Sequence, residues 1–316
     1  MNKKFALLFP GQGAQYPGMG KDFYDLFPAA RAVFEEADAI LSTKFSDLIF
    51  NGAAEELKKT KNSQLSIFIM SIALLRCFEE KFSPLAPQVV AGLSLGEFSA
   101  LVAAKKLSFR DALLLVKARA EYMNEACLKH KGAMSAVLGL EAAEVEAAIA
   151  HLENVWVANL NCPLQVVISG TPEGVEMASQ LLKQKGAKRA LPLEVSGAFH
   201  SGLMKEAQER LKSHVFEAAL LESEVDLVMN VPGGYVSSIE EIRSNMILQV
   251  THPVRWEQGI RAMVQKKIDL FIEIGPGKTL TGMNKKIAPS VPVFNLEKVA
   301  DLNILLEQFE VIYASA

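Results

Sequence analysis

Ser94 is the residue whose surroundings most clearly predict chemistry. Residues 92–96 read Gly-Leu-Ser-Leu-Gly and lie between a short apolar run at 89–91 and a helix-like segment at 97–104. A serine on a sharp turn between a strand and a helix is typical of a nucleophile elbow, and the flanking glycines leave room for that turn. The amide of Leu95, at the start of the helix, is then placed to donate to a developing oxyanion.

A nucleophilic serine needs a base within hydrogen-bond reach, usually a histidine. Four of the five histidines lie in solvated connections, turn-like stretches or amphipathic helices, which favours a surface or structural role: His130, His151, His214 and His252. His200 instead lies in an apolar, glycine-flanked loop at residues 196–202, directly after a predicted strand and at a boundary between two parts of the chain. We expect His200 to be the base, with a packed structural histidine as the alternative.

Arg119 is the residue that bears on the choice of substrate. In the predicted helix at 111–127, apolar residues recur at i, i+3, i+4 and i+7, and Arg119 lies in the middle of that stripe. The pattern predicts that its side chain points inward. A buried guanidinium needs an anion, and its planar fork suits a carboxylate. An internal salt bridge and a side chain that reaches back to solvent are the alternatives.

Most of the chain alternates strands and helices, which predicts a mainly parallel sheet. Strands are expected at residues 4–9, 227–230 and 268–274, a strand and the elbow together at 88–96, and helices between them. The glycine-rich loop at 11–15 is not a dinucleotide fingerprint, because Tyr16 stands where the third glycine would be, and no Walker lysine follows.

The middle of the chain has a different pattern. Strands at 132–138, 155–159, 165–169 and 188–195 and helices at 141–152 and 172–185 follow one another in the order βαββαβ. This is the order of a ferredoxin-like motif. We therefore predict a small subdomain at residues 129–197, inserted into a large subdomain formed by residues 1–128 and 198–316.

The composition indicates an ordinary globular protein. The chain has 316 residues, is 50% hydrophobic and carries a formal charge of -3 at pH 7. That charge argues against a nucleic-acid binder held by phosphate contacts. The three cysteines lack the spacing of a disulfide framework or a zinc site, and no stretch has the length of a signal peptide core or a membrane span. These features favour a cytoplasmic protein that binds neither nucleic acid nor membrane.

Taken together, these motifs resemble the malonyl-CoA:acyl carrier protein transacylase family, which includes the acyltransferase domains of fatty acid and polyketide synthases. The resemblance spans nearly the whole chain. It rests on the elbow followed by Glu97, on Arg119, on the His200 loop, and on residues 9–15, 132–134, 165–170 and 273–278. It implies an α/β-hydrolase-like core with a ferredoxin-like subdomain.

The resemblance also implies a role for each matching residue. Ser94 would be the nucleophile and His200 its base, with the amides of Gln12 and Leu95 as the oxyanion hole. Arg119 would hold the free carboxylate of a malonyl group. The backbone carbonyl of Gln249 would orient the histidine, Gln64 would line the acyl pocket, and no metal would take part.

The implied reaction transfers malonyl from malonyl-CoA to the phosphopantetheine thiol of acyl carrier protein through a malonyl-serine, supplying fatty acid synthesis. Coenzyme A would enter as the thioester substrate, the phosphopantetheine would belong to the partner, no cofactor would stay bound, and the chain would be a monomer. Two alternatives remain. One is a serine thioesterase or esterase with the same Ser-His pair, and the other is a non-catalytic binding protein on this fold.

Two residues depart from the family pattern. Leu93 stands where many members have histidine before the nucleophile, and Leu164 stands where a small residue usually precedes Gln165. Four basic residues of the small subdomain are candidates for docking an acidic carrier, with an ordinary solvated face as the alternative: Lys183, Lys185, Lys188 and Arg189.

Overall fold

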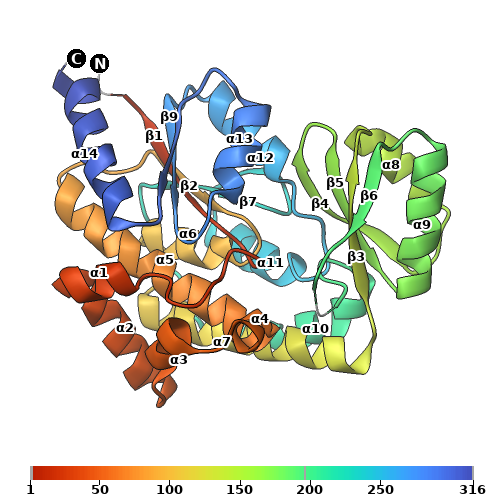
Figure 1. Ribbon diagram of the computed structural model, residues 1–316, viewed down its shortest axis with the longest axis horizontal. Helices are drawn as coiled ribbons and strands as arrows, with labels where there is room; N and C mark the ends of the chain where they lie inside the picture. The colour runs from red at the N-terminus through yellow and green to blue at the C-terminus, as the bar shows by residue number, and fades with distance from the viewer. Residues whose placement is uncertain (1–2, 196, 315–316) are drawn as a thin grey trace.

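The chain forms two lobes, each built on its own β-sheet (Figure 1). The computed structural model describes residues 3–195 and 197–314; Ser196, the first residue of the predicted histidine loop, lies outside them. The larger lobe holds a six-stranded sheet and the smaller lobe a four-stranded sheet. The fold class is therefore mixed α/β, as predicted.

The six-stranded sheet has the order β10-β9-β1-β2-β7-β8. Every neighbouring pair in it is parallel except β7 with β8. Its strands are β1 (Phe5–Phe9), β2 (Val89–Gly92), β7 (Asp226–Met229), β8 (Gly234–Val236), β9 (Leu270–Ile274) and β10 (Val293–Leu296). Strands β8 and β10 were not predicted from the sequence, because these edge strands are short and mostly half-buried and so lack a continuous apolar run.

Both faces of this sheet are covered by helices, as a parallel sheet requires. The side chains of β1 alternate: Leu7 lies in the core on one face, and Leu8 packs on the other face with Trp256. The helices of this lobe are α1 (Lys21–Leu26), α2 (Pro28–Leu41), α3 (Phe45–Asn51), α4 (Ala54–Lys58), α5 (Thr60–Phe82), α6 (Gly96–Ala103), α7 (Phe109–Lys129), the 3-10 turn Gly202–Met204, α10 (Lys205–Glu217), α11 (Ile239–Leu248), α12 (Trp256–Gln265), α13 (Thr279–Ile287) and α14 (Val299–Ala314).

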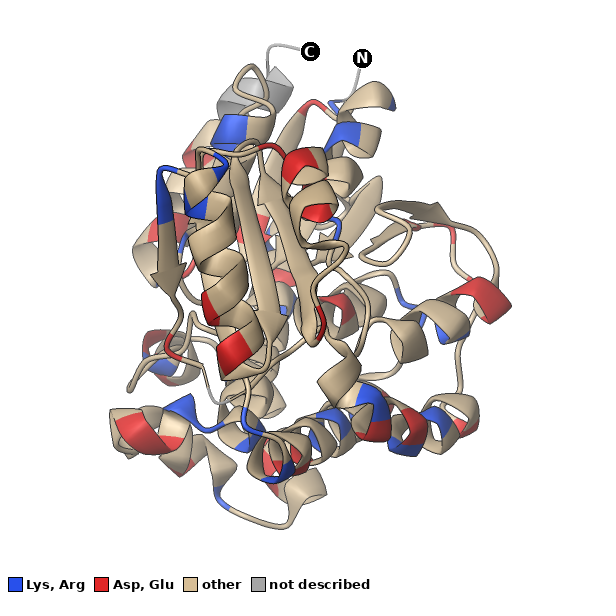
Figure 2. Ribbon diagram, turned by 90° about the vertical axis from the view of Figure 1, so that its right-hand side faces the viewer, with Lys and Arg blue, Asp and Glu red and all other residues tan. Residues whose placement is uncertain are grey.

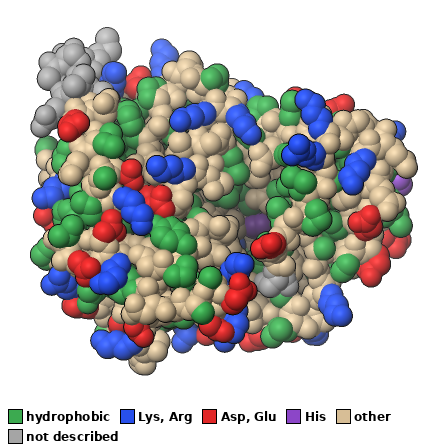
Figure 3. Space-filling view, viewed as in Figure 1, with side chains coloured by type: hydrophobic (Ala, Val, Ile, Leu, Met, Phe, Trp, Pro, Cys, Tyr) green, Lys and Arg blue, Asp and Glu red, His purple; other side chains and the backbone are tan. Residues whose placement is uncertain are grey.

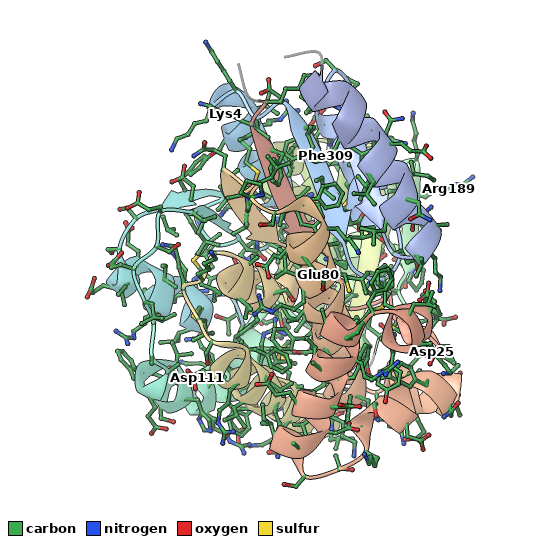
Figure 4. All side chains as sticks on the ribbon, turned by 90° about the vertical axis from the view of Figure 1, so that its left-hand side faces the viewer. Lys4, Asp25, Glu80, Asp111, Arg189 and Phe309 are labelled. Atoms are coloured by element: carbon green, nitrogen blue, oxygen red, sulfur yellow. The ribbon has the colours of Figure 1, made fainter. Side chains whose placement is uncertain are left out.

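The last helix, α14, closes the core beside the first strand. Phe309 of α14 lies between this helix and the sheet in Figure 4. Its ring is 5.9 Å from the ring of Phe5, centroid to centroid, in an edge-on arrangement. Burial of two aromatic rings of this size stabilises the contact between the ends of the chain by a few kcal/mol at most, about 1.5–3 kcal/mol for each ring.

The smaller lobe has the predicted βαββαβ order. Its elements are β3 (Ala133–Leu138), α8 (Ala142–Ile149), β4 (Val155–Cys162), β5 (Gln165–Gly170), α9 (Pro172–Gln184) and β6 (Arg189–Pro192). The antiparallel strands lie in the order β4-β5-β3-β6, which is the ferredoxin-like arrangement. Helix α9 begins as its sequence predicts, because Thr171 caps the amide of Gly174 at 3.1 Å and Pro172 occupies the first turn. On this element order we propose residues 129–197 as the inserted subdomain.

A short backbone contact ties the lobes together. The Leu160 amide on β4 donates to the Val254 carbonyl at 2.9 Å, and the Val254 amide donates to the Ala158 carbonyl at 2.8 Å. Because Val254 belongs to the larger lobe, this bridge joins the two lobes, and Figure 3 shows a hollow between them.

The carboxyl ends of β1, β2 and β7 lie at one edge of the large sheet. Phe9 at the end of β1 pairs in register with Gly92 at the end of β2, and β7 adjoins β2 on the other side. The segments that follow these strands therefore meet in space, and they carry Gln12, Ser94 and Asn230. In open α/β sheets this edge is where ligands bind.

The charged residues do not gather in one element. Figure 2 shows lysine and arginine interspersed with aspartate and glutamate over the helices and loops. Within the described part of the chain, no helix combines the length and the apolar character needed to cross a bilayer.

Candidate active site

The turn that carries Ser94 has the geometry of a nucleophile elbow. Ser94 adopts a φ of 51°, the left-handed region, between β2 and α6. A Cβ on Gly92 would lie 1.9 Å from the carbonyl carbon of Gly96, and a Cβ on Gly96 would lie 2.1 Å from the Phe9 carbonyl oxygen. Both glycines are therefore required by contact with backbone, and the turn holds the serine at the sheet edge.

The structure brings Ser94 and His200 together although they are far apart in the sequence. Ser94 Oγ lies 2.8 Å from His200 Nε2, and His200 Nδ1 lies 2.7 Å from the backbone oxygen of Gln249. Since a carbonyl oxygen only accepts, Nδ1 carries the proton and Nε2 is free to accept the serine hydroxyl proton. The imidazole is thus oriented by a carbonyl group.

His200 is kept neutral by its surroundings. The side chain is 4% exposed, and burial together with the nearby positive charge of Arg119 lowers the pKa of His200 to about 4. The imidazole is therefore unprotonated at neutral pH, the form in which it can accept a proton from Ser94.

Arg119, on α7, contacts Ser94 and points inward, as its place on the helix predicts. Only 1% of the residue is exposed. Its Nη1 donates to Gln64 Oε1 at 2.5 Å, and its Nη2 donates to Ser94 Oγ at 3.0 Å and to Gln249 Oε1 at 2.9 Å. These partners among the described residues are two amides and a hydroxyl, with no carboxylate. The guanidinium thus keeps donor capacity for an external anion.

Burial lowers the pKa of Arg119 to about 10, so the side chain is still a cation at neutral pH. Its Nε lies buried and makes no hydrogen bond with any described residue. A buried donor without a partner is costly. Both observations fit a site that an anionic ligand completes.

The side chains of Gln64 and Gln249 both accept hydrogen bonds from the Arg119 guanidinium. Gln64, on α5, is fully buried, accepts from Arg119 and donates to Met123 Sδ at 3.7 Å. Gln249 follows α11 and contacts Arg119 with its side chain and His200 with its backbone. Only the backbone carbonyl of Gln249 was predicted to contribute, so the contacts of its side chain with Arg119 and Glu97 are new.

The two amides expected to form an oxyanion hole come from the segments that follow the neighbouring strands β1 and β2. Leu95 immediately precedes α6, and Gln12 lies in the loop after β1 and lines the cavity. Neither amide donates a hydrogen bond to another described residue. Both are therefore available to a ligand oxygen.

Ser94 and His200 line a cavity of about 510 Å³ between the lobes. Ser94, Arg119 and His200 line it from the larger lobe, and Asn161 on β4 lines it from the smaller lobe. Leu93 also lines the cavity, so the departure from the family pattern places an apolar side chain there. A cavity of this size is typical of small-molecule sites.

Two buried residues that sequence analysis did not assign to the site support the elbow. Asn230 Oδ1 accepts from the Ser94 amide at 2.6 Å, and Asn230 Nδ2 donates to the Gly92 carbonyl at 2.7 Å. Glu97 accepts from the Asn230 amide and from Gln249 Nε2. Asn230 was detectable as a polar residue directly after a buried strand, and Glu97 as a charge within an apolar helix.

Glu97 is 1% exposed, and burial raises its pKa, while its two hydrogen-bond donors and Arg119 favour the charged carboxylate. The site thus joins a buried acid and a buried cation through the Gln249 side chain. Within the described residues, no cluster of three or more histidine, cysteine, aspartate or glutamate side chains is arranged to hold a metal ion.

Known proteins resemble this chain over most of its length. Residues 6–299 match the family model described as acyl transferase domain. The chain is 48% identical to a malonyl CoA-acyl carrier protein transacylase of Bacillus subtilis, over 90% of each sequence. It is 38% identical to the Escherichia coli K12 protein of the same name, over 96% of this chain and 99% of that protein.

Solved structures give the same result. The structure of MCAT from Streptococcus pneumoniae superposes with a TM-score of 0.92 at 40% identity, covering 96% of this chain and all of that one. A malonyl-transacylase solved in complex with a type II PKS acyl-carrier protein superposes with a TM-score of 0.93 at 36% identity, covering 97% of this chain and all of that one. The chain therefore belongs to the acyl transferase family.

Proposed function

We propose that this chain transfers malonyl from malonyl-CoA to the phosphopantetheine thiol of an acyl carrier protein, through a malonyl ester of Ser94. The observation that carries the proposal is that Ser94 Oγ contacts both a neutral imidazole and a buried guanidinium, at 2.8 Å and 3.0 Å. The first can activate a nucleophile, and the second can bind an acyl group that ends in a carboxylate. The names of the relatives support the same reaction.

In the first half-reaction, Ser94 Oγ attacks the thioester carbonyl of malonyl-CoA while His200 Nε2 takes the hydroxyl proton. The amides of Gln12 and Leu95 donate to the oxyanion of the tetrahedral intermediate. The carbon-sulfur bond then breaks, and the coenzyme A sulfur leaves with the proton from His200. The product is malonyl-Ser94 and free coenzyme A.

In the second half-reaction, the carrier's phosphopantetheine thiol attacks the ester carbonyl and gives its proton to His200 Nε2. Collapse of the intermediate breaks the bond to Ser94 Oγ, which takes the proton back. The carrier leaves with the malonyl thioester, and the enzyme is regenerated. The carbonyl of Gln249 holds the imidazole in one tautomer through both steps.

Arg119 supplies the preference for a carboxylated acyl group. The malonyl carboxylate would take the acceptor position that Ser94 Oγ fills at 3.0 Å, which frees the hydroxyl for attack. A charge-assisted hydrogen bond contributes about 1.5–3 kcal/mol, which corresponds to roughly tenfold to hundredfold discrimination against acetyl-CoA. Gln64 would steady the guanidinium from the other side.

The partners follow from this chemistry. Coenzyme A enters only as part of the substrate, the phosphopantetheine belongs to the carrier, and no cofactor needs to stay bound. Four exposed basic residues near the end of α9 are proposed to dock the acidic carrier: Lys183, Lys185, Lys188 and Arg189. We also propose that the chain acts as a monomer in the cytoplasm, which size-exclusion chromatography and cell fractionation would test.

One assay separates transfer from hydrolysis. Purified protein is incubated with malonyl-CoA, with and without a phosphopantetheinylated carrier, and both released coenzyme A and malonyl-carrier are quantified. The proposal expects stoichiometric transfer that depends on the carrier. Sustained coenzyme A release without carrier would indicate a thioesterase, and no release in either case would indicate a non-catalytic binding protein.

A further inference from the structure

The Gln249 side chain contacts three residues of the candidate site, Ser94, Glu97 and Arg119, and its backbone carbonyl contacts a fourth, His200. Gln249 Nε2 donates to the Ser94 carbonyl at 2.9 Å and to Glu97 Oε2. Gln249 Oε1 accepts from Arg119 at 2.9 Å. The two ends of this amide thus face opposite electrostatic partners, a carboxylate and a guanidinium.

An amide side chain can occupy the same space with its oxygen and nitrogen exchanged. In the exchanged orientation, the Gln249 oxygen would face the Glu97 oxygen, and the NH2 group would face the Arg119 guanidinium. Both contacts would then be repulsive in a buried environment where such costs are large. The Glu97 carboxylate therefore disfavours the exchanged orientation at one end of the amide, and Arg119 disfavours it at the other end.

Glu97 is itself held in a fixed position. It lies in the first turn of α6, and its second oxygen accepts from the Asn230 amide. Asn230 in turn binds the elbow on both sides of Leu93, through the Ser94 amide and the Gly92 carbonyl. The carboxylate is therefore anchored to the same turn that carries the nucleophile.

We propose that Glu97 is a positioning residue for acyl selectivity: it orients the Gln249 amide so that the amide oxygen holds Arg119 where the malonyl carboxylate binds. The proposal rests on the malonyl transfer proposed above. Glu97 contacts Gln249, does not line the cavity and takes no part in bond making. Its effect on the substrate passes through Gln249 and Arg119.

The test is the variant Glu97→Gln. An amide at position 97 can accept from the Asn230 amide or from Gln249 Nε2, but it places an NH2 group at the other contact. With Asn230 satisfied, the Gln249 amide must turn, and its NH2 group then faces Arg119. We expect kcat/KM for malonyl-CoA to fall about tenfold to hundredfold, with a smaller fall for acetyl-CoA. The malonyl-to-acetyl ratio should fall about tenfold.

Glu273→Gln is the matched control. Glu273 is also a fully buried carboxylate at the end of a strand of the same sheet, and it accepts from the amides of Leu280 and Thr281 and from the Thr281 hydroxyl. It makes no hydrogen bond with Gln249 or Arg119. Its variant should lower the melting temperature and leave the malonyl-to-acetyl ratio unchanged, which separates positioning from general destabilisation.

A second variant tests whether Glu97 acts on Arg119 through the Gln249 side chain. Gln249→Met removes the side-chain amide and keeps the carbonyl that orients His200. It should lower the malonyl-to-acetyl ratio, and adding Glu97→Gln to it should change the ratio little further, because the two changes act on one interaction. Should Glu97→Gln not fold, Glu97→Asp keeps the charge but withdraws it by one methylene, and a reduced ratio is again expected.

An unchanged malonyl-to-acetyl ratio in a folded Glu97 variant would overturn the proposal, as would an equal effect of Glu97→Gln with and without Gln249→Met. Failure of the wild-type protein to load malonyl at all would instead overturn the proposed function. The wild-type assay is therefore run first.

Discussion

Among the non-glycine residues in left-handed backbone, Ser94 of the larger lobe and Leu164 of the smaller lobe show two different uses of strain. Ser94 has a φ of 51°; its amide donates to Asn230 Oδ1, and its carbonyl accepts from Gln249 Nε2. Leu164 has a φ of 62° in the β4–β5 turn, is 42% exposed, and its carbonyl accepts from the Gly139 amide at 2.9 Å. The strained backbone at Ser94 is stabilised by a polar network beside the cavity, whereas the strained backbone at Leu164 lies in a surface turn.

The contrast extends to the surroundings of each turn. The edge of the large sheet gathers Glu97, Arg119 and His200 in an environment that shifts the pKa of all three. The small lobe is built on an apolar cluster that includes Val137, Ile168 and Leu182. Substitutions at the sheet edge should therefore change chemistry more than stability, and substitutions in the small-lobe turn should do the reverse.

Ser94→Ala should have the largest effect. Without the hydroxyl no acyl ester can form, so malonyl transfer should fall by about 10⁴-fold or more. The melting temperature should stay close to that of the wild type, because the backbone contacts of the turn are kept. Steady-state transfer assays and thermal melts measure the two quantities. Transfer within tenfold of wild type would remove Ser94 from the mechanism.

Arg119→Ala comes next. It removes the cation proposed to bind the acyl carboxylate, so kcat/KM for malonyl-CoA should fall by about tenfold to hundredfold relative to acetyl-CoA. The comparison uses loading rates of both thioesters on the same preparation. An unchanged malonyl-to-acetyl ratio would contradict the assigned role, even if both rates declined.

The protonation of His200 gives a smaller, pH-dependent prediction. Because burial and Arg119 lower the pKa of His200 to about 4, from its ordinary 6.5, kcat/KM for malonyl loading should hold steady from neutral pH down to about pH 5 and decline near pH 4. An acid limb centred near pH 6.5 would show that the folded protein does not shift this group. Arg119→Gln should move the limb toward higher pH, since one of the two causes is removed.

The same pKa shift affects stability. Between about pH 6.5 and 4 the unfolded chain binds a proton on His200 that the folded chain does not, so unfolding becomes easier as the pH falls through that window. His200→Gln should weaken this pH dependence. Chemical denaturation at pH 7 and at pH 5 measures the difference, and an unaltered pH dependence in the variant would contradict it.

Leu164→Gly should have the smallest effect and the opposite sign. A left-handed conformation costs an ordinary residue about 1–2 kcal/mol, and glycine gives back roughly 0.5–1 kcal/mol through the entropy of its unfolded chain. The free energy of unfolding should rise by about 0.5–1 kcal/mol with malonyl transfer unchanged. A loss of stability, or a changed transfer rate, would mean that this turn does more than connect two strands.

Features set by local sequence were predictable, and features that depend on long-range contacts were not. The elbow and the βαββαβ lobe were predictable, because glycine spacing and alternating apolar runs are local signals. The edge strands β8 and β10 were not, because they are short and half-buried. The links among Glu97, Asn230 and the Gln249 side chain were not predictable either, since each joins residues more than a hundred positions apart through hydrogen bonds that only the folded chain brings together.

Intact-protein mass spectrometry after brief incubation with malonyl-CoA, without any carrier, tests the central claim most directly. We predict that the wild-type chain gains the mass of one malonyl group, that peptide mapping places it on Ser94, and that addition of carrier protein removes it. The Ser94→Ala chain should gain nothing. A wild-type chain that stays unmodified while transferring malonyl to the carrier would contradict the account.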